Sequence, residues 1–372
     1  MGKWKTETFN EVLTIINGRN QKAVEDSSGK YPIYGSGGIM GYANDYLCDA
    51  NTTVIGRKGT INRPIFVEEP FWNVDTAFGL RANNDFLFPK YLYYFCESFN
   101  FEALNTTVTI PSLTKANLLQ IEIPLPPLPV QQQIADMLDR ANVLIEKRKA
   151  QIEKLDLLIK SQFIEMFGNP IANPIGWEEH MLFDYINFLT SGSRGWSAYF
   201  SKKGSAFLTI KNVKNSHLYL DNIQYVKPPN TKEAQRTRVQ NNDLLISITA
   251  DLGRTAVVTS DVADSGAYIN QHLSLVRLDC TKVNPLYVSY FLESQAGKKQ
   301  FEAKNQVGVK AGLNFDAIKS LKILIPPLSL QNEFASFVQQ VESQKRLLQQ
   351  SLAKLEQNYK SLMQKCFRGE IF

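Results

Sequence analysis

The chain has few of the side chains that most catalytic and metal sites use. Its 372 residues include four cysteines and three histidines. The cysteines form no CxxC pair, which argues against a structural zinc site and a disulfide framework and favours a reduced, cytoplasmic compartment. The histidines form no HExxH or HxH pattern, so the sequence offers few residues for a metal-dependent or histidine-based catalytic centre. We expect no cofactor and no metal.

Other sequence signals are missing as well. The apolar runs fall short of the roughly 18 residues of a membrane helix, so we expect no membrane span. The first residues, Met-Gly-Lys-Trp, are followed by polar ones, and no signal peptide is expected. The chain has no GxxxxGK[ST] phosphate loop and no Gly-rich cofactor loop after a strand. These absences predict a chain without catalytic activity of its own.

The composition is that of a soluble globular protein, with 44% hydrophobic and 21% charged residues, and the length allows two or three domains. The net charge of +5 is unevenly distributed. Residues 1–125 hold 11 Lys and Arg against 13 Asp and Glu, whereas residues 171–322 hold 18 against 13. A basic second segment suits a polyanionic partner, although many unrelated soluble domains carry a similar charge.

An internal repeat is the most informative feature that is present. The 45 residues Ile123–Phe167 recur without a gap 200 positions later as Ile323–Phe367, and 11 of the 45 are identical. The identical residues include a Pro-Pro-Leu motif, a glutamine and a Lys-Leu pair, namely Pro126-Pro127-Leu128 and Pro326-Pro327-Leu328, Gln131 and Gln331, and Lys154-Leu155 and Lys354-Leu355. The chain is therefore two copies of one unit, each a globular segment followed by a proline-punctuated strand and a long helix.

Each repeat carries an a/d heptad seam, with steps that alternate between four and three residues. The first seam is Ile134, Leu138, Ala141, Ile145, Arg148, Ile152, Leu155, Ile159, Gln162 and Met166, and the second is Phe334, Val338, Val341, Lys345, Leu348, Leu352, Leu355, Tyr359, Leu362 and Cys366. The Pro-Pro pairs fix both helix starts, and Gly168 and Gly369 are expected near the ends. A seam of about 33 residues is a rod of about 50 Å.

Such a seam is typical of a coiled coil that dimerises two chains. Two matched seams within one chain favour intramolecular, antiparallel pairing, because the linking domain gives a high effective concentration. Full overlap pairs residues whose numbers sum to about 500, so that Ile145 faces Leu355. Lys345 is then expected to pack its stem against Leu155 while its ammonium group reaches water.

The two globular segments follow one plan. Each is expected to open with a tryptophan and a short helical pattern, then a Gly/Ser-rich loop, short β-strands around a tight turn, and an aromatic helix. The openings are Trp4–Phe9 and Trp177–Leu182, the loops are residues 35–38 and 191–195, the turns are residues 57–59 and 251–254, and the aromatic helices are Pro89–Phe95 and Pro285–Phe291. Each segment therefore reads as a loop-rich α+β domain.

Loops that carry Arg or Lys beside Gly, Asn, Ser or Thr are the candidate binding sites. Cations suit phosphates and guanine edges, Asn can pair bidentately with adenine, and glycines let backbone N–H groups approach a phosphate. The residues expected to contact DNA are Tyr34, Ser36, Gly37, Arg57, Lys58, Asn62 and Arg63 in the first segment, and Arg194, Trp196, Lys202, Lys203, Lys211, Asn212, Arg254 and Lys310 in the second. The other interpretation is solvated surface loops, but the duplication favours DNA contact.

The whole chain resembles the specificity subunit of type I restriction-modification systems. The resemblance is strongest in residues 121–168 and 321–369, and in Tyr31–Gly41 together with Ile55–Thr60, which looks like one recurrent class of target recognition domain. It implies target recognition domains at residues 1–125 and 169–322, and long spacer helices at residues 126–168 and 323–372. It also implies an α+β fold with two pseudo-twofold-related, loop-rich recognition domains separated by two long helices that form an antiparallel coiled coil.

The resemblance further implies a non-catalytic component of a type I DNA adenine methyltransferase and restriction endonuclease complex. Each recognition domain would read one half of a split, asymmetric site in double-stranded DNA. The helices would set the gap and dock two methyltransferase (modification) subunits, with restriction subunits outside them. The methyl donor and ATP would belong to these partners. The alternative from a different class is a non-catalytic scaffold, with two protein- or carbohydrate-binding α+β modules on a coiled-coil rod.

Overall fold

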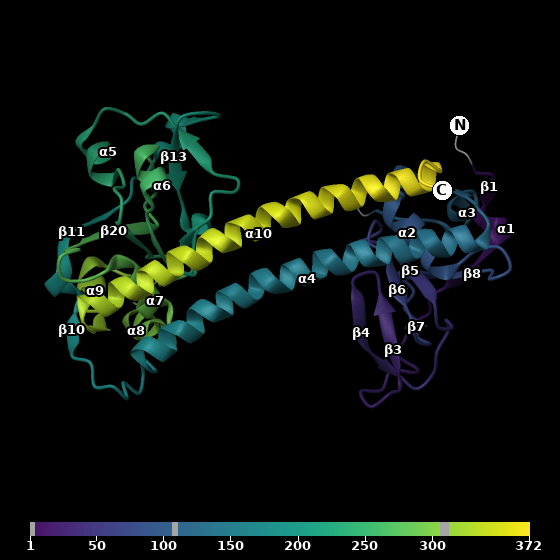
Figure 1. Cartoon of the computed structure of the whole chain (residues 1–372), viewed down its shortest axis with the longest axis horizontal. Coiled ribbons are helices and arrows are strands. Elements are labelled where there is room, and N and C mark those ends of the chain that lie inside the picture. The colour runs from purple at the N-terminus through teal and green to yellow at the C-terminus, as the bar shows by residue number, and fades with distance from the viewer. Residues whose placement is uncertain (1–3, 106–110, 306–311) are drawn as a thin grey trace. The chain divides into compact units, whose positions relative to one another are not determined.

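The computed structural model describes residues 4–105, 111–305 and 312–372, and the chain divides into two compact units. Unit 1 comprises residues 1–151 and 348–372, and unit 2 comprises residues 152–347. The two long helices are α4 (Leu128–Phe167) and α10 (Leu328–Arg368), drawn in blue and yellow in Figure 1. Because each helix crosses a unit boundary, each unit contains a globular part and a portion of both helices.

Unit 1 is built on a four-stranded antiparallel sheet in the order β2-β8-β5-β6. Its strands are β2 (Leu13–Asn17), β5 (Thr52–Gly56), β6 (Ile65–Val67) and β8 (Ala77–Ala82). A second sheet contains β3 (Tyr31–Gly35), β4 (Gly38–Ala43) and β7 (Trp72–Asn73), and β1 (Thr6–Thr8) pairs with β9 (Glu122–Pro124). The helices are α1 (Phe9–Val12), α2 (Pro89–Ser98), the 3-10 helix η1 (Phe101–Leu104) and α3 (Lys115–Leu119).

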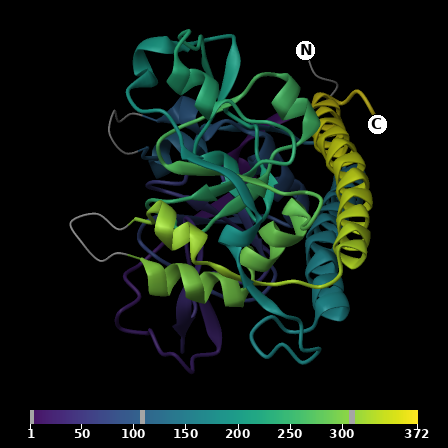
Figure 2. The same cartoon turned by 90° about the vertical axis from the view of Figure 1, so that its left-hand side faces the viewer.

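Unit 2, whose globular part is drawn in teal and green in Figure 2, has a four-stranded sheet in the order β11-β20-β17-β18. These strands are β11 (Ile186–Ser191), β17 (Leu244–Ser247), β18 (Thr255–Val257) and β20 (Leu273–Leu278). The other strands are β12 (Phe200–Ser201), β13 (Ser205–Leu208), β16 (Gln224–Val226) and β19 (Tyr268–Ile269) in one sheet, the hairpin β14 (Val213–Lys214) and β15 (His217–Leu218), and the pair β10 (Glu179–Met181) and β21 (Lys322–Leu324). The helices are η2 (Leu182–Tyr185), η3 (Trp196–Tyr199), η4 (Ile210–Asn212), α5 (Lys232–Thr237), α6 (Ser260–Asp264), α7 (Pro285–Glu293), α8 (Gln295–Lys304) and α9 (Phe315–Lys319).

The two globular segments, which were expected to follow one plan, share one topology. The four-stranded sheets have the same strand order, counted along the chain, and a parallel pair adjoins each, β3 with β7 and β13 with β19. Gly18 and Gly192 follow the first strand of each sheet. A Cβ atom at either position would lie 1.8 Å from the carbonyl oxygen of Val74 or 2.0 Å from that of Asn270. Both units therefore need glycine at this close backbone approach.

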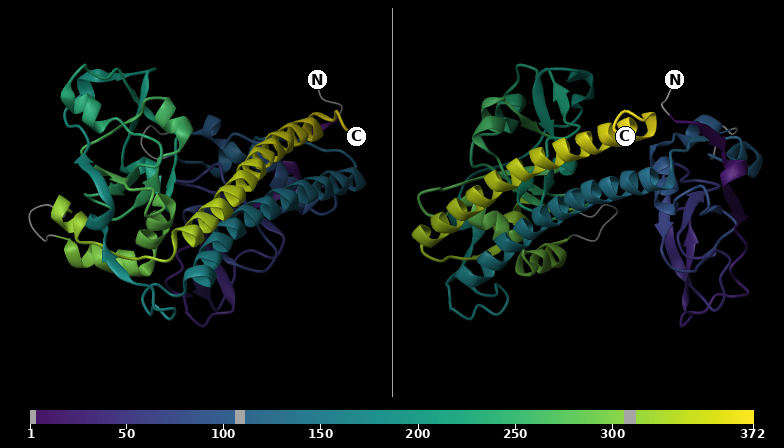
Figure 3. Two further views of the ribbon diagram at one scale, coloured as in Figure 1. Left: turned by 60° about the vertical axis from the view of Figure 1, so that its left-hand side comes forward. Right: turned by 45° about the vertical axis from the view of Figure 1, so that its right-hand side comes forward.

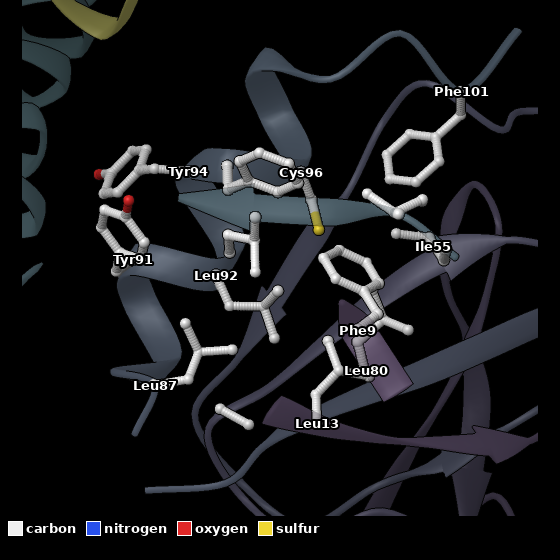
Figure 4. Packing of buried hydrophobic residues seen from close by; sticks show 14 of the residues in the cluster. Phe9, Leu13, Ile55, Leu80, Leu87, Tyr91, Leu92, Tyr94, Cys96 and Phe101 are labelled. Carbon is white, nitrogen blue, oxygen red and sulfur yellow. The ribbon is translucent and has the colours of Figure 1, made fainter. Parts of the chain in front are cut away.

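The core of unit 1 lies between its main sheet and α2. Phe9, Leu13, Ile55 and Leu80 come from the sheet side, and Tyr91 with its neighbours comes from α2 (Figure 4). The same buried cluster continues onto the long helices through the following residues: Ile134, Leu138 and Ile145 of α4, and Tyr359, Met363 and Cys366 of α10. The portion of the helix pair in this unit is therefore part of its core.

The predicted seams are confirmed. All of the predicted seam positions on α4 and α10 are buried or half-buried. The helices begin at Leu128 and Leu328, directly after the Pro-Pro pairs, and Gly168 and Gly369 follow their ends with φ values of 76° and 70°. A glycine in this left-handed conformation commonly terminates a helix.

The helices run antiparallel in both units, as the two views in Figure 3 show. In unit 1, Lys149 Nζ lies 4.0 Å from Glu356 Oε1. In unit 2, Lys345 Nζ is paired with Asp156. Both pairs agree with the predicted antiparallel pairing whose residue numbers sum to about 500. These helices pair within one chain, and the dimerising alternative is not needed to bury the seams.

The repeated glutamine fixes the start of each long helix. The buried side chain of Gln131 accepts a hydrogen bond from the Phe88 backbone N–H at 2.8 Å, and that of Gln331 accepts one from the Asn284 N–H at 2.9 Å. Phe88 and Asn284 cap the N-termini of α2 and α7. Each glutamine therefore ties a long helix to the aromatic helix of its own segment.

The repeated phenylalanine fixes the end of each long helix. The ring of Phe367 on α10 lies 5.1 Å from that of Tyr91 on α2, and Phe167 on α4 lies 4.7 Å from Tyr287 on α7. Helix α4 therefore begins beside α2 and ends against α7, whereas α10 begins beside α7 and ends against α2. Each unit holds the start of one long helix and the end of the other.

Two local predictions are wrong. The openings Trp4–Phe9 and Trp177–Leu182 are not short helices, because β1 and β10 pair with β9 and β21, and helical turns begin only at Phe9 and Leu182. Pairing with a strand far along the chain overrides the local helical pattern. The ammonium group of Lys345, which was expected to reach water, is instead paired with Asp156 and lies 3.7 Å from Glu342, and the side chain is 10% exposed.

Candidate nucleic-acid interface

In unit 1, the loop after β5 and the segment before β8 meet at one edge of the main sheet. The Arg57 backbone N–H donates to the Thr76 carbonyl at 2.8 Å, and Arg57 Nη1 donates to the Asp75 carbonyl at 3.5 Å. The guanidinium carbon of Arg57 lies 5.7 Å from the centre of the Phe78 ring. Arg57, Lys58 and Arg63 are all exposed, so this edge presents three cations to solvent.

The turn between β3 and β4 reaches the same edge. A Cβ atom added to Gly56 would lie 3.0 Å from Ser36 Cβ, so the turn is next to the start of the Arg57 loop. Gly37 is exposed and Ser36 half-buried. Tyr34 precedes the turn, half-buried, with its ring 5.4 Å from that of Phe71, and burial raises the pKa of its phenol. The structure thus brings together two loops that the sequence identified separately.

The side chain of Asn62 makes hydrogen bonds within the protein at this edge. Its Oδ1 accepts a hydrogen bond from the Phe101 backbone N–H at 2.7 Å, and its Nδ2 donates to Asn100 Oδ1 at 3.2 Å. The amide therefore satisfies a backbone donor at the start of η1, which would otherwise lack a partner. This use of the amide counts against the predicted bidentate contact with a base.

Unit 2 presents cations at the equivalent edge and on neighbouring loops. Arg194 is exposed after β11, and Arg254 is half-buried after β17, with Nη2 2.6 Å from Asp251 Oδ2. Lys202 and Lys203 are exposed in the turn between β12 and β13, and Lys211 is exposed in η4. Lys310 lies outside the described residues.

Trp196 and Asn212, which the sequence predicted to contact DNA, are buried in the structure. Trp196 is 4% exposed and stacks on Phe207 at 5.6 Å. Asn212 is 5% exposed; its Oδ1 accepts from the Thr209 N–H at 2.9 Å and its Nδ2 donates to the Tyr219 carbonyl at 2.8 Å. Both side chains make their contacts inside the protein and expose little surface, which counts against a direct contact with a duplex.

Two cations that the sequence did not single out lie in the same pocket of unit 2 as Arg254. Lys214 of β14 and Lys298 of α8 line a cavity of about 480 Å³ together with Arg254. The carboxylates of Asp251 and Glu293 line the same cavity. Lys214 and Lys298 lie in segments far apart in the sequence, and neither stands in a Gly-rich loop. Only the folded chain brings them beside Arg254.

Residues 1–154 and 176–357 match the family described as the type I restriction modification DNA specificity domain. The chain belongs to this family. The match falls in two stretches, one for each half of the internal repeat.

Similar proteins agree with this assignment. The chain is 20% identical over 350 residues to the type I restriction enzyme EcoBI specificity subunit of Escherichia coli, across 86% of this chain and 73% of that protein. Its fold is similar to the crystal structure of the type I restriction-modification system S subunit from M. genitalium, with a TM-score of 0.61 and 16% identity over 98% of this chain and 96% of that one. A chain from a structural study of type I R-M complex assembly gives a TM-score of 0.60, with 18% identity, over 100% and 98%.

These comparisons confirm the resemblance drawn from the sequence and the α+β fold with two long helices. The chain is a DNA-specificity component of the type I restriction-modification kind, not a catalytic subunit. The alternative of a protein- or carbohydrate-binding scaffold finds no support in them. Within the part of the chain that the structure describes, no helix is long and apolar enough to cross a membrane.

Proposed function

We propose that this chain reads a bipartite, asymmetric site in double-stranded DNA, one half-site with each unit. The single observation that carries the proposal is the shared sheet edge. Both units have the same strand order and the same glycine at the close approach, yet they present different side chains there. One scaffold with two sets of reading residues suits two different half-sites.

The proposed recognition domains are residues 1–125 and 169–322, and the proposed spacer helices are residues 126–168 and 323–372. Exposed cations neutralise phosphates and fix the register of a protein on DNA, whereas base edges carry the sequence information. The proposed DNA-facing residues are Tyr34, Ser36, Gly37, Arg57, Lys58 and Arg63 in the first domain, and Arg194, Lys202, Lys203, Lys211, Arg254 and Lys310 in the second. Of these, Tyr34, Ser36 and Arg254 are half-buried and are proposed for the margin of the contact.

The helices are proposed to dock two methyltransferase subunits. Apolar side chains on α4 remain exposed outside the seam, with Val143 and Leu144 in unit 1 at 49% and 55%, and Leu157 and Leu158 in unit 2 at 60% and 44%. Clusters of exposed apolar residues mark protein interaction sites. One such cluster in each unit is consistent with two docked subunits, and restriction subunits would join outside them.

The methyl donor and ATP are proposed to belong to those partners, and the complex to work in the cytoplasm. Three of the four free cysteines, Cys48, Cys96 and Cys366, are buried thiols. Unpaired cysteines are ordinary in a reducing compartment.

An electrophoretic shift titration of the chain in complex with its methyltransferase subunits tests the proposal. Binding to bulk duplex DNA should fall steeply as salt rises, because each phosphate contact releases counterions. A duplex that carries the bipartite site should survive competition by bulk DNA. Absence of DNA binding, or binding that ignores salt, would contradict the proposal.

A further inference from the structure

Three polar side chains form a hydrogen-bonded chain at the sheet edge of unit 2. Gln271 Nε2 lies 3.0 Å from His272 Nε2, and His272 Nδ1 lies 2.7 Å from Thr249 Oγ1. Gln271 and His272 directly precede β20, and Thr249 follows β17, the neighbouring strand in the sheet. All three side chains are half-buried, so each keeps a face toward solvent.

The chemistry of the three groups fixes the direction of the bonds. The amide Nε2 of Gln271 can only donate, so His272 Nε2 must accept. Because Nε2 of His272 accepts, the N–H of the ring lies at Nδ1 and donates a hydrogen bond to Thr249 Oγ1. This arrangement uses one N–H of Gln271 and leaves its second N–H and its Oε1 side by side.

Two hydrogen bonds fix the backbone that carries Gln271 and His272. The Gln271 N–H donates to the Ser193 carbonyl at 3.0 Å, and the His272 N–H donates to Asn270 Oδ1 at 3.1 Å. Ser193 is 0% exposed, so the acceptor of the first of these bonds lies inside the protein. Rotamer freedom that is already restricted in the free protein need not be given up on binding, and a preorganised contact discriminates better.

We propose that Gln271 reads an adenine in the second half-site, with His272 and Thr249 as positioning residues. An adjacent amide donor and acceptor match the N7 acceptor and N6 donor that adenine presents in the major groove. Guanine presents two acceptors there and cytosine a donor, so neither offers the same pair of bonds. The inference rests on the proposed DNA-reading function and names a base for it.

The surroundings suit a base contact flanked by phosphate contacts. Arg194 is the residue after Ser193, and Arg254 lies in the same loop as Thr249. Ala250, next to Thr249, has a φ of 57°, which is unusual for a residue with a side chain. Strained backbone of this kind tends to occur where function requires a particular loop geometry.

The equivalent positions in unit 1 carry different chemistry. The Ile248 N–H donates to the His272 carbonyl at 3.0 Å, and the Arg57 N–H donates to the Thr76 carbonyl at 2.8 Å, so Thr76 stands where His272 does. Asp75 therefore takes the place of Gln271. An ionised carboxylate only accepts hydrogen bonds, so this position cannot read adenine as an amide does. The two units are equipped for different bases.

Selection from a pool of random-sequence duplexes tests the inference, using the chain in complex with its methyltransferase subunits. The wild type should select a second half-site with adenine at one fixed position. Gln271→Ala should lower the preference at that position by about tenfold or more and leave all others intact. Gln271→Glu should shift the preference toward cytosine, whose N4 group donates to a carboxylate.

Variants of Thr249 test the positioning role. Thr249→Val removes the hydroxyl at nearly constant shape and should weaken the adenine preference, whereas Thr249→Ser should restore it. Gln240→Ala is the matched control, because Gln240 is exposed at the opposite end of β17. It should select the wild-type site. Because all of these residues lie in unit 2, retention of the other positions of the second half-site reports that unit 2 of each variant is folded.

The outcomes separate this inference from the function on which it rests. A wild-type protein that selects a bipartite site, together with Gln271→Ala and Gln271→Glu variants that select the same site, overturns the inference and leaves the proposed function standing. A wild-type protein that selects no site overturns the proposed function itself. Relaxation of a position other than adenine by Gln271→Ala also overturns the inference.

Discussion

The ammonium group of Lys345 on α10 donates a hydrogen bond to the carboxylate of Asp156 on α4. Within unit 2, the side chain of Lys345 is 10% exposed, and Glu342 lies 3.7 Å away as a second carboxylate. Burial lowers the pKa of Lys345, but the bond to Asp156 and the two negative charges outweigh it, so the net pKa is raised. A charge at a seam position is kept ionised by its partners and thereby favours one antiparallel register.

A double-mutant cycle on this pair should reveal a coupling free energy of about 1–2 kcal/mol, since the pair is in contact but Asp156 is half exposed. The variants are Lys345→Ala, Asp156→Ala and the double variant, and the measurement is urea unfolding of the full chain. Lys319 and Asp316, 3.8 Å apart with both side chains exposed, form the control pair and should couple by less than about 0.5 kcal/mol. Equal coupling in both cycles would show that burial is irrelevant.

Replacing either repeated glutamine by leucine should lower the free energy of unfolding by about 2–4 kcal/mol, because a buried backbone N–H and at least one carbonyl are left without a partner. Gln131→Leu affects the Phe88 N–H and the Pro126 carbonyl, and Gln331→Leu the Asn284 N–H and the Pro326 carbonyl. Denaturant titration measures the change. Gln133→Leu, at an exposed position of α4, is the control and should cost little; a similar loss of stability there would refute this role.

The stability of unit 2 should depend on pH through His217 and Glu342, whose Nε2 and Oε1 atoms are 3.0 Å apart. Burial lowers the pKa of His217, but the adjacent carboxylate of Glu342 leaves it raised above 6.5. Burial raises the pKa of Glu342, but the adjacent His217 and Lys345 leave it lowered below 4.5. The stabilisation that His217 contributes is complete below the pKa of the histidine in the unfolded chain. It is lost as the pH rises through the higher pKa that His217 has in the folded chain. The stabilisation that Glu342 contributes is complete above the pKa of the glutamate in the unfolded chain. It is lost as the pH falls through the lower pKa that Glu342 has in the folded chain.

The pair therefore stabilises most between pH 4.5 and 6.5. Denaturant midpoints measured across this range and above it should fall as the pH exceeds the raised pKa of His217. His217→Gln should remove that part of the pH dependence. An unchanged pH profile in the variant would mean that another group titrates.

Removing the three exposed cations of the unit 1 edge should weaken DNA binding and flatten its salt dependence. Arg57→Ala, Lys58→Ala and Arg63→Ala together should lower the salt slope by roughly one unit for each phosphate that is no longer neutralised. If one of the three side chains reads a base, its removal should also relax one position of the first half-site, by about 1–3 kcal/mol. Arg81→Ala, an exposed cation further along β8 and paired with Asp49, is the control and should leave both unchanged. Unchanged DNA binding by the triple variant would show that this loop does not contact DNA.

Lengthening both spacer helices should change the gap between half-sites without changing either half-site. The change is an insertion of about one helical turn near residue 150, matched by one near residue 350, which adds about 5 Å to each helix. Such an insertion, a stutter, locally unwinds the coiled coil and keeps the apolar seams of the two helices facing each other. Selected or methylated sites, sequenced before and after, report the gap. An insertion in one helix alone is the mismatched comparison and should destabilise the pair. A changed half-site with a constant gap would contradict the ruler role.

The sequence predicted the features that depend on local pattern. The seams, their Pro-Pro starts and the glycines after their ends follow from periodicity and backbone chemistry, and the structure places them as expected. The pairing of β1 with β9 joins residues more than a hundred positions apart, and no local pattern near Trp4 predicts it. Trp196 is ambiguous by chemistry, because an aromatic ring beside an arginine suits a core as well as a base. Gln271, His272 and Thr249 come together only when β17 pairs with β20.

Sequencing of methylated adenines in cells that carry this chain with its methyltransferase subunits tests the central claim most directly. Two short sequences separated by a fixed, unread gap should be found, with one methylated adenine in each half and different bases in the two halves. Exchanging residues 169–322 for those of a relative should replace one half and leave the other unchanged. A single continuous site, or no methylation that depends on this chain, would contradict the account.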